Sequence, residues 1–440
     1  MAEHLQRRTE FLSFDGAVRL TALHQRPDRY RHLDEIVGRS LIARGGGYAY
    51  SAASFGADSC SLDMTAFDRL LAFDPLRSTL KVEAGARIID VLKWAINRGL
   101  QLPVFPGYPL VTIGGCIAGD VHGKNPWRDG TFADWVEAIT IFHPDKGYVN
   151  VSSETDPTLF RLTCGGFGLT GVIVDATLRL ISLPGTDVEL ISQPVGSLPE
   201  AVDRLANSTD DFSYSWHDAA PTKNFGRGLV NTGRWVQRER GDHSLRYRPI
   251  DARTRAGIPV SLWNSTTVRC ANALFYRING HWRPRRRMSF LEAGFPLARN
   301  VAYLAGFGRP GMREIQILLD EIHIGPFIRE LEQLVARERP PLVMASLKRF
   351  SGKQSSLSPT GMGYLIAIDL RPGSAANHFM ARIDDLMLDM EGQPNLSKDS
   401  RISCQVAARS IRNYANFAEA LCRYDPSRRF ASGLSERIGL

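Results

Sequence analysis

The stretch Thr112-Ile-Gly-Gly-Cys-Ile-Ala-Gly-Asp-Val-His122-Gly-Lys124-Asn125 decides what fold we expect. Its small side chains allow the backbone to lie close to a flat ligand. The run ends in two basic groups, His122 and Lys124, which would sit beside that ligand. Glycine-rich runs also form plain turns, so the assignment depends on the surrounding sequence. The stretch therefore predicts one wall of a cofactor site, with two basic side chains at its C-terminal end that can take part in the chemistry.

The composition is that of an ordinary globular protein. The chain has 440 residues, of which 43% are hydrophobic and 23% charged, and this length suggests two domains or more. The formal net charge of +8 favours anionic partners such as phosphorylated substrates or anionic lipid headgroups. No run reaches the roughly 18 apolar residues of a membrane span, and the N-terminus lacks the apolar core of a signal peptide. We expect a cytoplasmic protein, with peripheral contact at the inner face of the plasma membrane as an option.

The cysteines and the basic residues exclude several classes of site. Six scattered cysteines form no CxxC pair, so we expect reduced thiols and no metal. No helix-turn-helix, zinc finger or aromatic-interleaved basic motif is present, and we expect no nucleic acid partner. The segment 281–288 holds four arginines and Trp282. It is either a solvated loop or a site for a membrane interface or a phosphate.

The pattern of apolar residues indicates an α+β protein. Strands are predicted at 40–43, 80–84, 135–142, 172–180, 314–319 and 363–370, and helices at 87–98 and 326–337. After Gly185 the composition changes, and the predicted strands are richer in aromatic residues and arginine. The pattern of apolar residues is least regular in 220–300. Beyond Lys398 the chain becomes helical again. This order suggests two domains, the second with a mobile insertion.

A second glycine-rich segment precedes the opening stretch. The loop from Arg44 to Ser51 contains three consecutive glycines, whose N–H groups can form a nest for a pyrophosphate. It is not the GxGxxG fingerprint, because the chain continues as a loop and no acidic ribose ligand follows at the usual offset. Two more segments follow in order, 106–124 and 164–173. Three such segments favour a phosphate-bearing cofactor over three unrelated turns.

Together these three segments resemble the FAD-binding domain of the vanillyl-alcohol-oxidase (PCMH) type of flavoenzyme. More closely, 112–125 is similar to the signature of the decaprenylphosphoryl-β-D-ribose 2-oxidase family. Two C-terminal patterns of that family recur, Lys398-Asp-Ser-Arg401 and Asp425-Pro-Ser-Arg-Arg-Phe-Ala-Ser432. The resemblance covers nearly the whole chain and is weak only across about 220–305.

The resemblance implies an α+β, two-domain flavoprotein. Residues 1–187 would form the FAD-binding domain, and 188–392 a substrate domain built on an antiparallel sheet with a mobile basic insertion at about 220–305. Residues 393–440 would return to the FAD-binding domain. The FAD is expected to be non-covalent, because the first glycine loop lacks the histidine that holds the flavin in related oxidases.

The resemblance also implies roles for single residues. The cofactor-binding set is Arg44, Gly45, Gly46, Gly47, Tyr48, Ala49, Tyr50, Ser51, Gly107, Thr112, Gly114, Gly115, Gly119, His122, Gly171 and Ile173. The substrate-binding set is Lys124, Gln316, Lys348 and Asn395. The catalytic residues are Lys398 and His122. Ala367 stands where family members have a cysteine, and Asn395 where they have a tyrosine, which leaves the sugar and the lipid open.

Oxidation of a secondary alcohol sets the chemical requirements of the site. A hydride leaves carbon for the flavin while the hydroxyl proton departs, so the site needs a proton acceptor and a positive charge near the reduced flavin. Lys398 is a candidate for that charge or for the base. His122 would orient the hydroxyl or take part in the proton transfer, and Lys124 or Lys348 would bind a phosphate oxygen. The residue sequence leaves the identity of the base open.

We therefore expect an FAD-dependent enzyme that oxidises C2 of a polyprenyl-phosphoryl-ribose-like substrate to a ketone. A separate NAD(P)H-dependent short-chain reductase would complete the epimerisation to the arabino form. One alternative is an alditol or aldonolactone oxidase or dehydrogenase acting on a soluble sugar, since one fold hosts many chemistries. Another is a non-catalytic flavin-binding or membrane-binding protein.

Overall fold

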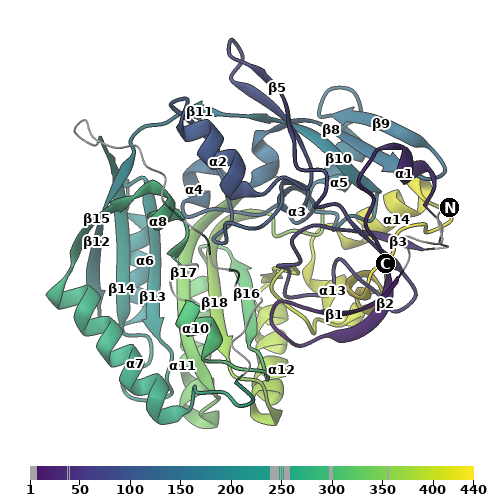
Figure 1. The fold of residues 1–440 in the computed structure, drawn as a ribbon. Coiled ribbons are helices and arrows are strands. Elements are labelled where there is room, and N and C mark those ends of the chain that lie inside the picture. The colour runs from purple at the N-terminus through teal and green to yellow at the C-terminus, as the bar shows by residue number, and fades with distance from the viewer. Residues whose placement is uncertain are drawn as a thin grey trace.

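The computed structural model describes residues 7–36, 38, 40–237, 247, 249, 251, 258–296, 301–353 and 356–440. Within them the protein is a mixed α/β molecule whose main sheets have four, five and eight strands (Figure 1). The sheets of five and eight strands are antiparallel throughout. No helix in this part of the chain is long and apolar enough to cross a bilayer.

The N-terminal part contains two sheets. The four-stranded sheet has the order β1 (Arg7–Leu12), β2 (Arg19–Gln25), β4 (Cys60–Asp63) and β3 (Leu41–Arg44), and α1 (Arg31–Asp34) lies between β2 and β3 in the chain. The five-stranded sheet has the order β5 (Leu70–Asp74), β6 (Thr79–Glu83), β10 (Val172–Arg179), β8 (Val136–His143) and β9 (Gly147–Ser152). A short pair joins β7 (Leu100–Gln101) to β11 (Ile181–Ser182).

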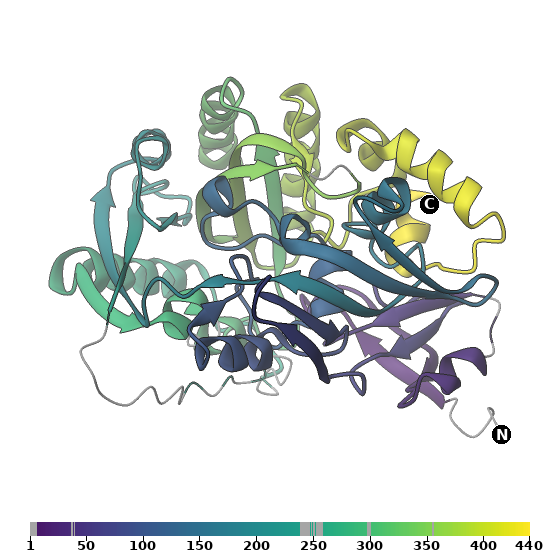
Figure 2. The same cartoon turned by 90° about the horizontal axis from the view of Figure 1, so that it is seen from above.

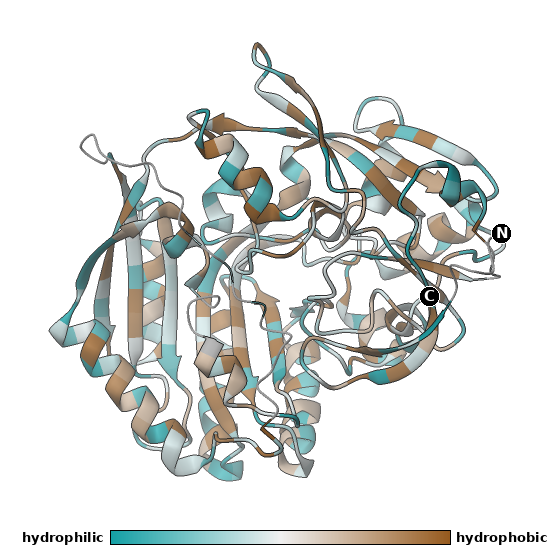
Figure 3. Ribbon diagram, viewed as in Figure 1, coloured by the Kyte–Doolittle hydropathy of each residue, from teal (hydrophilic) through white to brown (hydrophobic). Residues whose placement is uncertain are grey.

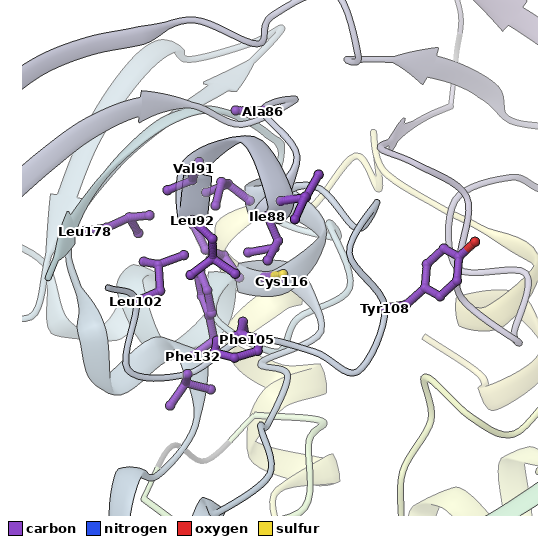
Figure 4. Close-up of a cluster of buried hydrophobic side chains, with 14 of the residues drawn as sticks. Ala86, Ile88, Val91, Leu92, Leu102, Phe105, Tyr108, Cys116, Phe132 and Leu178 are labelled. Carbon is purple, nitrogen blue, oxygen red and sulfur yellow. The ribbon is translucent and has the colours of Figure 1, made fainter. Parts of the chain in front are cut away.

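Short helices pack against the five-stranded sheet. They are α2 (Ile88–Ile96), α3 (Ile113–Ala118), α4 (Pro126–Asp129), the 3-10 turn η2 (Phe132–Trp135) and α5 (Pro157–Thr163). The apolar positions of α2 recur at helical spacing, so Ile88, Val91 and Leu92 all point into the core. Figure 4 shows these side chains around Cys116 of α3 and Leu178 of β10. This packing fixes α3, the helix that carries the opening stretch.

The eight-stranded sheet supplies the second half of the molecule. Its order is β15 (Arg285–Ser289), β12 (Asp187–Val195), β14 (Gly228–Val236), β13 (Phe212–Asp218), β17 (Leu342–Gly352), β18 (Gly361–Leu370), β16 (Arg313–Leu319) and β19 (Gln393–Pro394). Three helices cover one face, α6 (Leu198–Ala206), α11 (Ile324–Glu338) and α12 (Ser374–Asp389) (Figure 2). Because side chains alternate along a strand, the other face is left for the cavity described below.

The remaining helices lie at the sheet's far end and at the C-terminus. α7 (Ser265–Arg277), the π-helical turn η3 (Ile278–Trp282), α8 (Phe290–Gly294) and α10 (Val301–Ala305) lie in the segment between β14 and β16. α13 (Cys404–Ser410), α14 (Tyr414–Tyr424) and α15 (Gly433–Ile438) end the chain. The C-terminal segment returns to the N-terminal sheets, since Leu41 N–H donates to Arg429 O at 2.8 Å. The division of the chain at 187 and 392 stays a prediction.

The predicted strands and helices are confirmed to within a few residues, but the arginine-rich region is more regular than expected. It contains β14, α7 and β15. The solvated-loop interpretation is wrong for two arginines of β15, because β12 offers them partners. Arg287 Nε donates to Asp187 Oδ2 at 2.9 Å, and Arg286 donates to Ser192 Oγ at 3.1 Å. The part of the predicted mobile insertion at 238–246, 252–257 and 297–300 lies outside the described residues.

Candidate active site

A cavity of about 950 Å³ lies between the glycine-rich segments of the N-terminal part and the open face of the eight-stranded sheet. Its walls come from the loop after β3, from 106–124, from the start of β10 and from β16, β17 and β18. Segments about three hundred residues apart in the sequence thus line the same cavity. Cavities of this size and mixed character are typical of cofactor and substrate sites.

The loop after β3 forms the first wall. A Cβ on Gly45 would lie 2.1 Å from Thr112 Oγ1, so only glycine allows this loop to pack against the N-terminus of α3. Gly47 has a φ of +73°, a conformation that glycine adopts without strain. Among the described residues, the backbone N–H groups of Gly47 and Ala49 have no hydrogen-bond partner. Free N–H groups in such a loop suit an anionic oxygen.

The opening stretch forms the second wall. Thr112 caps α3 by accepting a hydrogen bond from Gly115 N–H at 3.2 Å. A Cβ on Gly114 would lie 3.0 Å from Ala84 Cβ, so the glycine lets α3 lie close to the end of β6. At Gly107 and Gly115, by contrast, the nearest atoms to an added Cβ are 3.6 and 3.2 Å away. A methyl group there would occupy cavity space, and the wall therefore fits a flat ring system.

The structure brings the predicted cofactor residues together with one exception. Fifteen of the sixteen line the cavity: Arg44, Gly45, Gly46, Gly47, Tyr48, Ala49, Tyr50, Gly107, Thr112, Gly114, Gly115, Gly119, His122, Gly171 and Ile173. Ser51 is buried and is not among the residues that line the cavity. Its hydroxyl has no hydrogen-bond partner within the described residues. A cofactor role for Ser51 stays a prediction.

Three lysines from distant segments share the cavity. Burial lowers the pKa of Lys348 to about 8, with a further contribution from the charge of Lys398. Burial, followed by the charges of Lys348 and Lys398, holds the pKa of Lys124 well below its usual range. Lys398 Nζ lies 3.5 Å from Glu314 Oε2 and 4.0 Å from the ring centre of Tyr50. Among the described residues only Lys398 of these three lysines has a carboxylate within ion-pair distance, so an anionic ligand would stabilise the charged forms of the other two.

His122 and two amide side chains form a polar chain on the sheet side. Asn395 Nδ2 donates to Gln316 Oε1 at 2.5 Å, and the side chain of Gln316 lies beside His122. Burial, with the nearby charge of Lys348, lowers the pKa of His122 to about 3. The imidazole is therefore neutral at physiological pH. Predicted catalytic and substrate residues Lys398, His122, Lys124, Gln316, Lys348 and Asn395 all line the cavity.

A buried acidic pair was missed by the sequence analysis. Glu314 of β16 and Asp369 of β18 are direct cross-strand partners, and both line the cavity. Tyr303 OH donates to Asp369 Oδ2 at 2.6 Å. Like charges directly opposite each other are unfavourable, and burial together with Glu314 raises the pKa of Asp369 to about 8. Glu314 lies two positions from Gln316, and Asp369 two positions from Ala367. Residues two apart on a strand face the same side of the sheet, so this spacing was the sequence signal that could have placed both acids in the site.

The raised pKa of Asp369 predicts the pH dependence of stability. The folded chain keeps the proton up to about pH 8, whereas an ordinary aspartate loses it near 3.8. The free energy of unfolding should therefore fall as pH rises from about 4 to about 8. Asp369→Asn should flatten that slope, as measured by urea unfolding across this range. An unchanged slope in the variant would show that Asp369 is ionised in the folded protein.

Comparisons with known proteins agree with this geometry. Residues 36–152 match the family described as an FAD binding domain. The chain is 26% identical over 416 residues to decaprenylphosphoryl-β-D-ribose oxidase of Mycolicibacterium smegmatis, which covers 92% of this chain and 90% of that protein. The chain is an FAD-dependent oxidoreductase, and it is similar to that oxidase along nearly its whole length. Its cofactor is FAD, and the alternative of a non-catalytic flavin-binding protein falls away.

Some relatives match over a smaller share of the chain. L-galactono-1,4-lactone dehydrogenase 1 of Oryza sativa is 29% identical over 120 residues, which is 27% of this chain and 20% of that protein. D-lactate dehydrogenase of Anaerostipes hadrus is 27% identical over 150 residues, 33% of this chain and 31% of that protein. The likeness to the ribose oxidase is long enough to include the eight-stranded sheet, which carries Lys348, Glu314 and Asp369.

Proposed function

We propose that this flavoenzyme oxidises the C2 hydroxyl of a polyprenyl-phosphoryl-ribose-like substrate to a ketone. The observation that carries the proposal is the cluster of Lys124, Lys348 and Lys398 in one cavity beside the glycine wall. A soluble neutral polyol needs no such surplus of cations, whereas a phosphodiester does. The relative that spans nearly the whole chain is named for a phosphoryl-linked ribose.

Different residues of the cavity would bind the cofactor, the reacting hydroxyl and the phosphate of the substrate. The glycine wall and the loop after β3 would hold FAD without a covalent bond, which when bound supplies the hydride acceptor. Gln316 and His122, which lie beside each other in the cavity, would hold the reacting hydroxyl. Because its pKa keeps the imidazole neutral, His122 has a ring nitrogen that can accept a hydrogen bond from the hydroxyl and orient it. Lys124 and Lys348 would bind the phosphate oxygens.

Lys398 has a different role in this proposal. Glu314 holds its ammonium at 3.5 Å, and Tyr50 lies beneath it. The charge is thereby fixed in place, so it stabilises negative charge that develops on the cofactor side without reorganisation. The ketone product would then be reduced by a separate NAD(P)H-dependent reductase, which gives the arabino epimer and a role in cell-envelope polysaccharide synthesis.

The substrate class is tested by anaerobic mixing, with flavin absorbance as the readout. We expect polyprenyl-phosphoryl ribose to bleach the flavin, and free alditols and aldonolactones not to bleach it at equal concentration. Bleaching by the free polyols alone would overturn the proposal. It would instead favour a soluble sugar or lactone oxidase, the activity class indicated by the lactone dehydrogenase that matches a smaller share of the chain.

The pKa of Lys348 predicts how substrate binding depends on pH. Below about pH 8 the ammonium is charged, and above it the charge is lost. The affinity for a phosphorylated substrate should therefore weaken above about pH 8, while the bleaching rate at saturation changes little, because His122 stays neutral throughout. Lys348→Met should bind weakly at every pH and show no such transition. A transition that persists in the variant would assign it to another group.

A further inference from the structure

One exposed surface of the molecule plays no part in the site just described. It lies on α7, η3 and the start of β15, and we call it the α7 surface: Arg269, Leu274, Arg277, Trp282 and Arg285. Leu274 is 52% exposed and Trp282 is 67% exposed. Figure 3 shows hydrophobic segments along the outside of α7. Large exposed apolar side chains gathered on one element mark an interaction site more often than scattered ones do.

The charge of this surface has a single sign. Residues 258–291 contain six arginines and no aspartate or glutamate. In the part of the chain that the structure describes, no carboxylate pairs with Arg269, Arg277 or Arg285. Other exposed arginines do have such partners, for example Arg204 with Glu200 and Arg423 with Glu419. The unpaired charge of the α7 surface therefore faces solvent.

The two sides of α7 differ in what they meet. Its inner side is anchored to the sheet, because Asn272 Nδ2 donates to Asp218 Oδ1 and to Val343 O, both at 2.8 Å. Ala271, Asn272, Ile278 and Asn279 line the cavity from this side. Phe275 lines the cavity and is also partly exposed. The helix is thus a wall of the cavity, with the α7 surface on its outside.

We propose that the α7 surface docks the enzyme on an anionic membrane. Arginine, tryptophan and leucine exposed on one surface are side chains that bind at a lipid headgroup boundary, where the charged tips reach the phosphates and the apolar parts enter the acyl region. A nucleic acid offers no acyl region for Leu274. A second copy joined through the same surface would bring two sets of unpaired arginines together.

The placement has a consequence for the substrate. Because α7 separates the docked surface from the cavity by the width of one helix, a lipid-linked sugar would reach the cavity past Phe275 while its lipid stays in the membrane. This consequence rests on the proposed function, but the docking itself does not. A vesicle experiment needs neither sugar nor turnover, so the two proposals fail separately.

The test uses the full-length holoenzyme and sedimentation with large vesicles. We expect at least tenfold stronger partition onto vesicles of phosphatidylglycerol and phosphatidylcholine than onto phosphatidylcholine alone, and weaker partition at high salt. Arg277→Glu with Arg285→Glu should lower the partition at least tenfold. Trp282→Ala should lower it several-fold, including at high salt, because its contribution is apolar.

The matched control carries the same charge change on the opposite face of the sheet. Arg329→Glu with Arg382→Glu, on α11 and α12, should leave the partition unchanged. Retained flavin absorbance and an unchanged melting temperature show that each variant is folded. If the double variant Arg277→Glu with Arg285→Glu is not folded, Trp282→Ala alone tests the proposal. Equal loss in both double variants would reduce the effect to net charge and overturn the proposal. So would vesicle binding unaffected by the α7 changes, or a change of mass in solution caused by them.

Discussion

Lys398→Ala is expected to lose flavin reduction while keeping its FAD. The lysine is held by Glu314 on one side and by the ring of Tyr50 on the other, so its charge is fixed where electron density would accumulate. Removal of one preorganised stabilising group typically costs about 10²- to 10³-fold in rate. The rate of anaerobic bleaching by substrate should fall by that factor, and the protein should remain yellow.

Two further variants separate this role from a general effect. Lys353→Ala removes an exposed lysine near the end of β17 and should bleach at the wild-type rate. Glu314→Gln keeps the ammonium but loses its carboxylate partner, and we expect a smaller loss of rate than in Lys398→Ala. Normal bleaching by Lys398→Ala would remove Lys398 from the chemistry. Loss of the yellow colour would make it a residue of cofactor binding instead.

Gly115→Val is expected to abolish FAD binding without unfolding the chain. The nearest atom to an added Cβ is Thr112 Oγ1 at 3.2 Å, so the local packing can adjust, while the isopropyl group enters the cavity. The purified variant should be colourless. When FAD is added to it, the fluorescence of the FAD should not be quenched and its absorbance spectrum should not shift. Because nothing in the core is displaced, urea unfolding should match that of the wild-type apoprotein.

The same change away from the cavity provides the control. Gly325 lies on α11, on the opposite face of the eight-stranded sheet, and an added Cβ there meets no atom closer than 3.8 Å. Gly325→Val should therefore purify with normal flavin content. If Gly115→Val also retains FAD, the flat wall at α3 does not contact the cofactor, and the cavity must bind FAD along its other side.

The amino-acid sequence by itself determined the cofactor half of the protein. The three glycine-rich segments could be recognised because runs of residues without side chains are visible in the sequence, and the cap of Thr112 on Gly115 joins residues only three positions apart. The packing of Gly45 against Thr112, by contrast, joins distant segments. Strands such as β6 and the helix α2 were predictable for the same reason, since alternation and helical spacing are properties of short segments.

The electrostatics of the site were decided only by the tertiary structure. Glu314 and Asp369 are 55 positions apart in the chain, and they become neighbours through the register of β16 on β18. The arginines of 281–288 likewise divided between hydrogen bonds to β12, the cavity lining and the α7 surface only once the strand order was set. Charge and pKa depend on burial and on partners brought together by long-range pairing, and a linear pattern of residues carries neither.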